Sequence, residues 1–336
     1  MKLWWRSHTD LLCSWTVVCK ELVRACQNLG HEVWDSNETP RFPHQWIEVW
    51  WGAPKDWSWS GKPVVARVGL TLSESDQLIR SEQERALENL KLCDYLFVPT
   101  QSSLRAFYEM PLDKEIGLWP LGVDTERFQY TNRFIYADET FRFLHLGVTQ
   151  FRKGSWLVPE AFIAAFDEGD NVELTIASHG KSPMWESLEW EYGNHPLIKF
   201  IAEAKENPAR HYDGMHVFVS PHLAEGWGLC ITEAMSLGMP CLVSRCSAPR
   251  DYFKPDFGWW VEMSGLYAPV RQCLTDTPGF WRLPDVHDLS DKMRYAYEHR
   301  EECECKGKES AAYVRDNLTW EMGVTKALDW GFCGNH

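Results

Sequence analysis

The chain of 336 residues is 44% hydrophobic and 24% charged, a composition typical of globular proteins that predicts about two domains. Its formal net charge of −14 provides no overall attraction to nucleic acid or to anionic lipid. No run approaches the roughly 18 apolar residues of a membrane span. Charges interrupt the only apolar stretch near the N-terminus, so we expect neither a transmembrane helix nor a signal peptide.

The eleven cysteines are scattered and include no C-x-x-C pair. Cys303 and Cys305 are too close together, and have too few potential partner ligands, to indicate a zinc site. This pattern is typical of a reducing compartment, in which most thiols are buried as small apolar side chains. Because a basic amphipathic helix for membrane attachment is not found either, we expect a cytoplasmic protein with no membrane partner.

The N-terminal part alternates predicted strands and helices. Strands are expected at 2–5, 32–34, 45–51, 63–68 and 93–100, an amphipathic helix at 14–28 and a polar helix that ends near 92. Several of the nineteen tryptophans cluster here, at Trp4, Trp5, Trp46, Trp50, Trp51, Trp57 and Trp59. We expect most of them to pack in the core or between domains, and stacking on a sugar ring or a base is the alternative.

The second half has the same alternation after a polar stretch, 129–139, that is predicted to be an interdomain linker. Strands are expected at 141–146, 172–177, 198–201, 217–219 and 241–243, with helices at 156–166, 231–237 and 289–300 and a terminal helix after 320. Two halves that each alternate strand and helix predict an α/β protein with two doubly wound domains.

The most informative stretch is 216–241. A short apolar strand is followed by a loop with Gly226 and Gly228, a helix that carries Glu233, and a second strand after Pro240. Ligands bind where such strands end and such helices begin. The glycines allow phosphates to approach the backbone, and the helix N-terminus offers free N–H groups. A carboxylate in that helix suits two vicinal hydroxyls, such as those of a ribose.

These residues resemble the E-x7-E signature of retaining GT-B glycosyltransferases of the family-4 type, EGFGLxxxEAMxxGxPV. The matching residues are Glu225-Gly226-Trp227-Gly228-Leu229, Glu233-Ala234-Met235 and Gly238-Met239-Pro240, with Trp227 in place of the usual Phe. Weaker similarities are Leu29–Val33 to LGHEV, Leu121–Phe128 to nGVDxxxF, and Gly147 with Arg152-Lys153-Gly154 to GrxxxrKG. The similarity is strong over 141–251 and weak over 1–90.

The resemblance implies a GT-B fold of two Rossmann-like, doubly wound domains with a cleft between them. Residues 1–130 would form the N-terminal domain on the acceptor side. Residues 140–315 would form the C-terminal domain, which holds the nucleotide-sugar. The helix in 316–336 would cross back to the N-terminal domain.

The resemblance also implies transfer of a sugar from a UDP- or GDP-sugar to a hydroxyl, with retention of configuration. Arg152 and Lys153 would neutralise the diphosphate, Glu225 would lie near the transferred sugar, and Glu233 would hold the ribose. The other donor-site candidates are Gly147, Gly226, Trp227, Gly228, Leu229 and His179. The chain lacks a D-x-D motif, so we expect no metal and no cofactor beyond the nucleotide-sugar co-substrate.

Each of these assignments has a structural alternative. Arg152 and Lys153 could be a surface pair at a helix start, which the helix dipole disfavours slightly. His179 could equally be a surface histidine. On the acceptor side, 6–10 replaces the family's Gly-Gly loop, and the candidates are His8, Glu74 and Asp76. For the two acids, a role in the first turn of a serine-capped helix is slightly favoured.

We carry two alternatives for the function. The first is the same chemistry on a hydroxylated base of DNA, as in virus-encoded DNA modification, where aromatic residues would stack on a flipped base. It would place the protein in a host cytoplasm, although the acidic balance argues mildly against phosphate contacts. The second is a non-catalytic GT-B protein that binds a nucleotide-sugar. The compact chain without a membrane helix fits a soluble acceptor.

Overall fold

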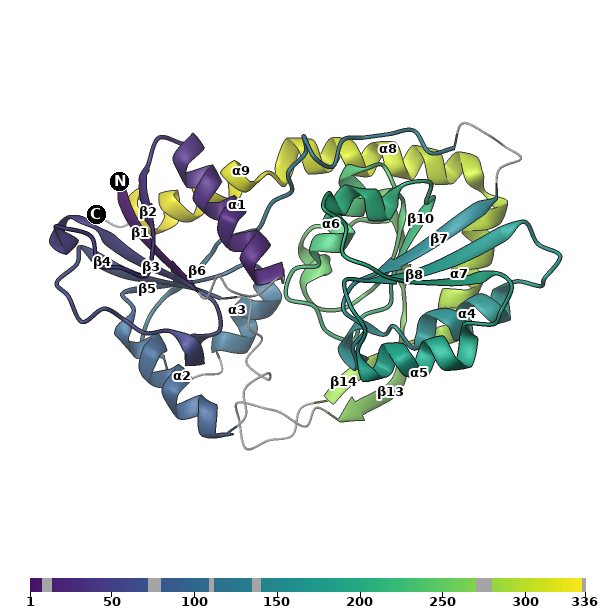
Figure 1. Ribbon diagram of the computed structural model, residues 1–336, viewed down its shortest axis with the longest axis horizontal. Helices are drawn as coiled ribbons and strands as arrows, with labels where there is room; N and C mark the ends of the chain where they lie inside the picture. Colours follow the sequence, from purple (N-terminus) through teal and green to yellow (C-terminus); the bar gives the residue numbers. More distant parts are fainter. Residues whose placement is uncertain (8–13, 72–79, 109–111, 135–139, 270–279, 334–336) are drawn as a thin grey trace. The chain divides into compact units, whose positions relative to one another are not determined.

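The computed structural model describes residues 1–7, 14–71, 80–108, 112–134, 140–269 and 280–333 (Figure 1). The chain forms two compact units. The first comprises Met1–Asp124, Pro269–Phe280 and Leu318–His336, and the second Thr125–Ala268 and Trp281–Asn317. In the part of the chain that the structure describes, no helix is both long and apolar enough to cross a bilayer. Nor do three or more His, Cys, Asp or Glu side chains of these residues group as metal ligands would.

The first unit contains a six-stranded parallel sheet with the strand order β2-β1-β3-β4-β5-β6. Its strands are β1 (Lys2–Ser7), β2 (Glu32–Asp35), β3 (Ile47–Trp51), β4 (Ala66–Leu70), β5 (Tyr95–Val98) and β6 (Ile116–Leu118). Its helices are α1 (Ser14–Asn28), α2 (Arg80–Leu92), α3 (Gln101–Tyr108) and α9 (Trp320–Leu328). The strand predicted at 63–68 begins three residues later and ends two residues later, because β4 pairs with β3 in a register that sets Ala66 opposite Ile47.

The early tryptophans contribute large side chains to the core of this unit. Trp4, Trp5, Trp50, Trp51 and Trp57 are all at most 2% exposed, so the prediction that they pack in a core is confirmed. Packing is close enough that a Cβ on Gly69 would overlap the Trp57 ring. Near the other end of the chain, α9 packs against α1, where the Asn28 side chain donates to Glu321 at 2.9 Å.

The second unit has the strand order β12-β11-β10-β7-β8-β9, all parallel. Its strands are β7 (Phe141–Leu146), β8 (Val172–Ser178), β9 (Ile198–Ala202), β10 (Val217–Ser220), β11 (Cys241–Ser244) and β12 (Gly258–Val261). Its helices are α4 (Leu157–Ala165), α5 (Pro183–Tyr192), α6 (Leu229–Ser236), α7 (Val286–Glu298) and α8 (Arg300–Asn317), and a two-stranded sheet joins β13 (Met263–Pro269) to β14 (Phe280–Pro284).

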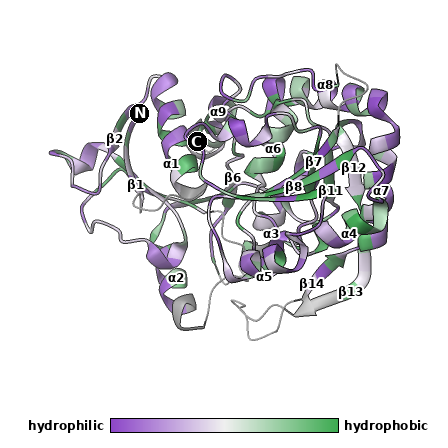
Figure 2. Ribbon diagram, turned by 45° about the vertical axis from the view of Figure 1, so that its right-hand side comes forward, coloured by the Kyte–Doolittle hydropathy of each residue, from purple (hydrophilic) through white to green (hydrophobic). Residues whose placement is uncertain are grey.

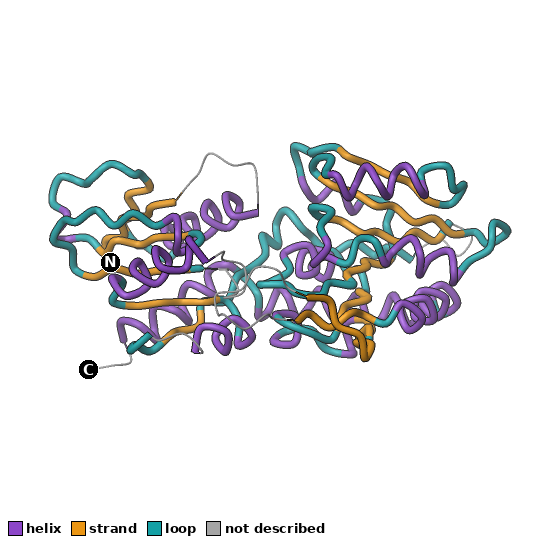
Figure 3. Tube along the Cα trace, turned by 90° about the horizontal axis from the view of Figure 1, so that it is seen from below, coloured by secondary structure: helices purple, strands orange, loops and turns teal. Residues whose placement is uncertain are grey.

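Counted from β7, this order is 3-2-1-4-5-6, the order of doubly wound dinucleotide-binding domains. The strand order reverses between β7 and β10. Both faces of the sheet are covered, so its strands are apolar along most of their length, as the green ribbon of Figure 2 shows for β8 and β11. Figure 3 shows the alternation of strands and helices along the trace of both units. The predicted doubly wound α/β fold is confirmed.

The stretch predicted as a linker is packed rather than free-standing in its described part. The Arg133 guanidinium donates to the main-chain carbonyls of Tyr212 at 2.6 Å and of Leu237 at 3.1 Å. The Tyr130 ring lies where a Cβ on Gly238 would stand. These contacts explain why residues after Asp124 group with the second unit.

Candidate functional site

The predicted phosphate-binding residues and the first motif glutamate meet at the point where the strand order of the second unit reverses. β7 ends at Leu146 and β10 ends at Ser220, and the loops that follow these adjacent strands carry Arg152 with Lys153 and Glu225, respectively. In doubly wound sheets the loops diverge at this point and leave a crevice for a ligand. The two loops are joined directly, since the Leu223 N–H donates to the Arg152 carbonyl at 2.7 Å.

A glycine allows these loops to approach each other. A short 3-10 turn, Phe151–Lys153, ends at Gly154, whose φ of +66° is left-handed. A Cβ at this position would overlap the carbonyl of Pro221 in the neighbouring loop. Because only glycine avoids both problems, the R-K-G triplet places its two cations against the β10 loop as a consequence of local sequence.

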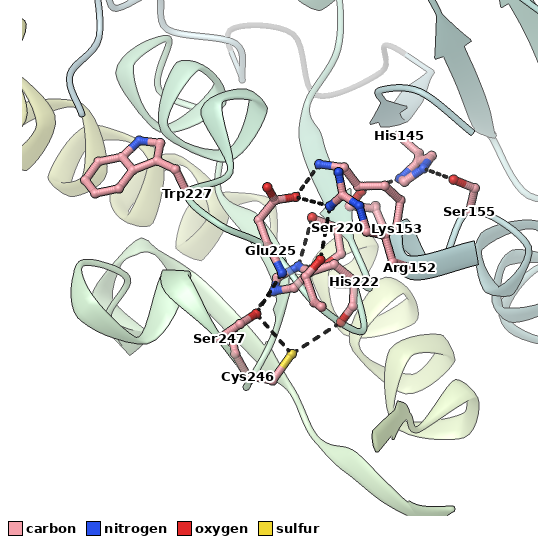
Figure 4. Close-up of polar contacts among 12 residues, drawn as sticks. His145, Arg152, Lys153, Ser155, Ser220, His222, Glu225, Trp227, Cys246 and Ser247 are labelled. Carbon is pink, nitrogen blue, oxygen red and sulfur yellow. Dashed lines mark hydrogen bonds and ion pairs between the residues drawn. The ribbon is translucent and has the colours of Figure 1, made fainter. Parts of the chain in front are cut away.

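Lys153, Arg152 and Glu225 form one charge cluster (Figure 4). The Lys153 ammonium forms an ion pair with Oε2 of Glu225, and Nη1 of Arg152 lies 3.7 Å from the same oxygen. Nη1 of Arg152 also donates to the Ala224 carbonyl at 3.3 Å. The Glu225 side chain is 11% exposed, against 28% for Arg152 and 22% for Lys153. The cluster therefore carries a net positive charge whose cations still reach solvent.

The cations set the charge of Glu225. Burial alone would raise the pKa of this carboxyl, but the charges of Lys153 and Arg152 outweigh burial and lower the pKa to about 2. Glu225 is thus a carboxylate at neutral pH.

A loop that sequence reasoning did not single out holds the main chain of Glu225. The Glu225 N–H donates to Oγ of Ser247 at 3.0 Å, and its carbonyl accepts from the Ala248 N–H at 3.1 Å. Ser247 has a φ of +45°, which is rare for a residue other than glycine. Strained backbone of this kind persists where surrounding contacts over-determine it, often at functional sites. The sequence carries no signal for it, since serine does not mark a left-handed position.

Two buried histidines lie beneath the charge cluster and were also missed. Nδ1 of His145 is 2.8 Å from the Val219 carbonyl and its Nε2 is 2.9 Å from Oγ of Ser155. His222 contacts Ser220 through Nδ1, at 3.2 Å from Oγ. Burial lowers the pKa of both histidines to about 4, so both are neutral at pH 7.

The glycine motif forms the start of α6. Gly228 is the N-cap of this helix with a φ of +91°, and a Cβ there would crowd the side chains of Ile231 and Tyr252. The Trp227 side chain points away from the charge cluster in Figure 4 and packs on the Tyr252 ring at a centroid distance of 5.0 Å. Trp227 is 3% exposed, so its side chain is closed to a ligand, and its carbonyl accepts from the Tyr252 phenol at 2.6 Å. Gly226 and Leu229 flank this segment and are half-buried.

Glu233 lies in a different environment from Glu225. It is half-buried on α6, and its Oε2 accepts a hydrogen bond from the Tyr212 phenol at 2.6 Å. Burial raises the pKa of Glu233 to about 7, against the opposing effects of Tyr212 and Arg127. The two motif glutamates therefore differ in charge state: one is firmly ionised and the other titrates near neutrality.

The remaining donor-side candidates lie at the same edge of the sheet. Gly147 follows β7 directly with a φ of +150°. His179 follows β8, is exposed, and contacts the buried His211 ring at a centroid distance of 5.2 Å. Although the residue is exposed overall, partial burial of its ring lowers the pKa of His179.

The three acceptor-side candidates, His8, Glu74 and Asp76, lie outside the described residues.

Comparison with known proteins shows sequence similarity to glycosyltransferases. Residues 140–276 match the family model described as "Glycosyl transferases group 1". A curated relative, the sulfoquinovosyl transferase SQD2 of Arabidopsis thaliana, is 26% identical over 223 residues, which are 63% of this chain and 39% of that protein. The chain thus spans about two fifths of the length of this relative.

Solved structures of glycosyltransferases match nearly the whole chain. Sucrose-phosphate synthase from Thermosynechococcus elongatus has a TM-score of 0.71 at 14% identity, with 96% of each chain covered. HepE from Anabaena, in complex with UDP and glucose, has a TM-score of 0.71 at 11% identity, covering 98% of this chain and 99% of that one. WaaG, involved in lipopolysaccharide biosynthesis, has a TM-score of 0.65 at 13% identity, covering 99% and 100%. The fold is that of GT-B glycosyltransferases, as predicted.

Proposed function

We propose, from the match of residues 140–276 to the group 1 glycosyltransferases, that this protein transfers a sugar from a nucleotide-sugar to a hydroxyl acceptor. The observation that carries the proposal is the charge cluster of Arg152, Lys153 and Glu225 at the reversal of strand order, since both cations stay accessible while the carboxylate between them is ionised. A glycosyl transfer needs both kinds of charge at one place.

The two cations suit the leaving group. As the bond between the anomeric carbon and the diphosphate oxygen breaks, negative charge grows on the diphosphate, and preorganised cations stabilise it. Arg152 and Lys153 are held by the β10 loop on one side and open to solvent on the other. They would provide the charge that a divalent metal provides in other glycosyltransferases, and we propose a metal-independent reaction on that basis.

Glu225 suits the transferred sugar. A carboxylate that is held ionised next to the diphosphate site can accept hydrogen bonds from sugar hydroxyls and stabilise the positive charge that develops at the anomeric carbon. Its main chain is fixed through Ser247 and Ala248, so its position requires little rearrangement on binding. We propose retention of configuration: the acceptor oxygen attacks the face from which the diphosphate leaves, and its proton passes to the departing phosphate oxygen.

Glu233 suits the ribose of the donor. It lies two turns after Glu225 along the motif, in the helix whose N-terminus follows the glycine loop. Its carboxylate oxygens can accept from both ribose hydroxyls. HepE of Anabaena has been solved with UDP-glucose, and we propose a uridine diphosphate sugar as the donor here.

The acceptor is proposed only as a hydroxyl compound. The net charge of −14 gives no support to DNA as the acceptor.

Donor turnover separates a transferase from a non-catalytic binder. We would measure UDP release from UDP-glucose by the wild type and by the Glu225→Ala, Arg152→Ala and Lys153→Ala variants. Each variant should lose at least about a hundredfold in turnover, the usual cost of removing one charge-stabilising group. Lys199→Ala, which removes an exposed lysine of the same unit paired with Glu173, serves as the control. Equal turnover in the parent and the Glu225→Ala variant would refute the catalytic role.

A thermal-shift series identifies the nucleotide. UDP, GDP, ADP and TDP are added without metal, and the one that the folded protein binds raises the melting temperature by mass action. We expect UDP to give the largest rise, and Lys153→Ala to reduce it. A protein that none of the four nucleotides stabilises would not fit the proposal.

A further inference from the structure

The Tyr212 phenol makes a short hydrogen bond to the second motif glutamate, Glu233. It is the last residue of a 3-10 turn, Pro208–Tyr212, and its phenol donates to Oε2 of Glu233 at 2.6 Å. The ring is fully buried and packs against Phe128 and Phe218, each at a centroid distance of 6.1 Å. The ring therefore cannot turn away from the carboxylate without disturbing the core.

The main chain of Tyr212 is fixed as firmly as its ring. Nη1 of Arg133 donates to the Tyr212 carbonyl at 2.6 Å, while Nε of the same guanidinium donates to the Leu237 carbonyl at 3.1 Å. Leu237 is the C-cap of α6, the helix that carries Glu233. One arginine thus ties the turn of Tyr212 to the helix of Glu233, which sets the distance between phenol and carboxylate from both ends.

In the pair of Tyr212 and Glu233, the phenol donates the hydrogen bond and the carboxylate accepts it. Tyr212 and Arg127 both lower the pKa of Glu233. The Cys230 thiol, three residues earlier in the chain, is the other titratable group that interacts with this carboxyl. Burial raises the pKa of Tyr212 well above its ordinary value, so the phenol keeps the proton that it donates to Glu233. A donor of this kind stabilises the carboxylate form of Glu233 over the neutral acid.

We propose that Tyr212 is a positioning residue for nucleotide recognition, one that orients the Glu233 carboxylate and keeps it ionised for the ribose hydroxyls of the donor. The inference rests on the proposed function for the identity of the ligand. With one lone pair of Oε2 taken by the phenol, Oε1 and the second lone pair of Oε2 remain for the two hydroxyls. An uncharged carboxyl would present a hydroxyl donor where the ribose also presents donors, and a rotated carboxylate would aim its acceptor oxygens elsewhere.

The first test needs no ligand. The carboxyl carbon of Glu233 is followed by NMR in the glutamate-labelled full chain while the pH is varied, and its signal is assigned by its loss in Glu233→Gln. Tyr212→Phe should raise the midpoint of this titration by about one pH unit, a tenfold change in the protonation equilibrium. Tyr252→Phe is the matched control, because it removes an equally buried phenol that donates to the Trp227 carbonyl at 2.6 Å.

The second test measures UDP affinity between pH 6 and pH 9. Glu233→Gln, which cannot titrate, supplies the pH dependence that belongs to UDP itself. Against that reference, the wild type should bind UDP more tightly as the pH rises through neutrality. Tyr212→Phe should show the same increase in affinity at a pH about one unit higher. Its loss of affinity should be about fivefold at pH 7, approach tenfold near pH 6 and shrink towards pH 9.

The outcomes are distinct. An unchanged Glu233 midpoint in Tyr212→Phe, or a loss of UDP affinity that is equal at every pH, would overturn the positioning role, because a merely structural tyrosine weakens binding without moving a titration. A shifted midpoint in a protein that binds neither UDP nor the other nucleotides would support the Tyr212–Glu233 coupling and overturn the proposed function.

Discussion

Lys153→Met tests whether the charge cluster is held together by its ion pair. The substitution nearly keeps the length of the side chain and removes the ammonium that pairs with Glu225. Glu225, a residue that is 9% exposed, then keeps the more distant Arg152 as its cationic partner. Removing one partner of a buried pair is costly because the remaining charge stays desolvated. We therefore expect a larger loss of stability than a surface lysine would give.

The magnitude follows from the pKa of Glu225. Its pKa is lowered from the ordinary 4.5 to about 2, a difference of 4.5 − 2 = 2.5 units. At about 1.4 kcal/mol per unit, the attraction of the cations exceeds the cost of burying the carboxylate by about 3 kcal/mol. Because the folded-state pKa of an acid is depressed, this stability is fully present above pH 4.5 and is lost as the pH falls towards 2. Lys153→Met should lose most of it at pH 7, and Lys153→Met with Glu225→Gln should recover at least half.

Melting temperatures at pH 7 give the readout. For a unit of this size, about 3 kcal/mol corresponds to a decrease of about 6–12 °C. Lys181→Met is the control, since Lys181 forms an exposed pair with Glu189 at 2.7 Å and should cost less than about 1 kcal/mol. If Lys153→Met lowers the melting temperature equally whether residue 225 is Glu or Gln, the pair is not what stabilises the loops, and the reasoning fails.

Two further predictions concern the surroundings of the cluster. Gly154→Ala should lower the free energy of unfolding by at least about 2 kcal/mol and remove most of the donor turnover, because φ is +66° and the new Cβ meets the Pro221 carbonyl. Gly180→Ala is the control, since no atom lies within 4 Å of its Cβ, and it should change neither quantity. Equal effects of the two substitutions would contradict the geometry. His145 and His222 have pKa values of about 4, below the ordinary 6.5, so stability should be full above pH 6.5 and fall as the pH decreases towards 4. His145→Asn should flatten this fall in a pH series of melting temperatures, and an unaltered slope would show that folding does not lower the pKa of His145.

Local patterns in the sequence were sufficient for the elements and for part of the site. β10 and β11 begin with continuous apolar runs, 217–219 and 241–243, which predict buried strands of a parallel sheet whatever surrounds them. The glycines of the motif and the R-K-G triplet act through backbone geometry, which depends on the residue itself. The early tryptophans were correctly assigned to a core, since aromatic side chains of this size are seldom left in water.

Elements without such local signals were missed or misplaced. Nothing in Ile116–Leu118 predicts a strand by itself, and β6 forms because β5 offers it an edge to pair with. The start of β4 is likewise decided by its pairing with β3 rather than by its own residues. Strand pairing is a property of two segments, so one segment read alone cannot determine it.

What only the tertiary structure decided is the pairing of polar groups across the chain. Lys153 and Glu225 are 72 positions apart, and their contact depends on β7 and β10 becoming neighbours in the sheet. Tyr212 and Ser247 resemble any core tyrosine and loop serine until a glutamate is placed beside each of them. A side chain's type sets what it can donate or accept, whereas its partner, burial and charge state are set by elements that arrive from elsewhere in the chain.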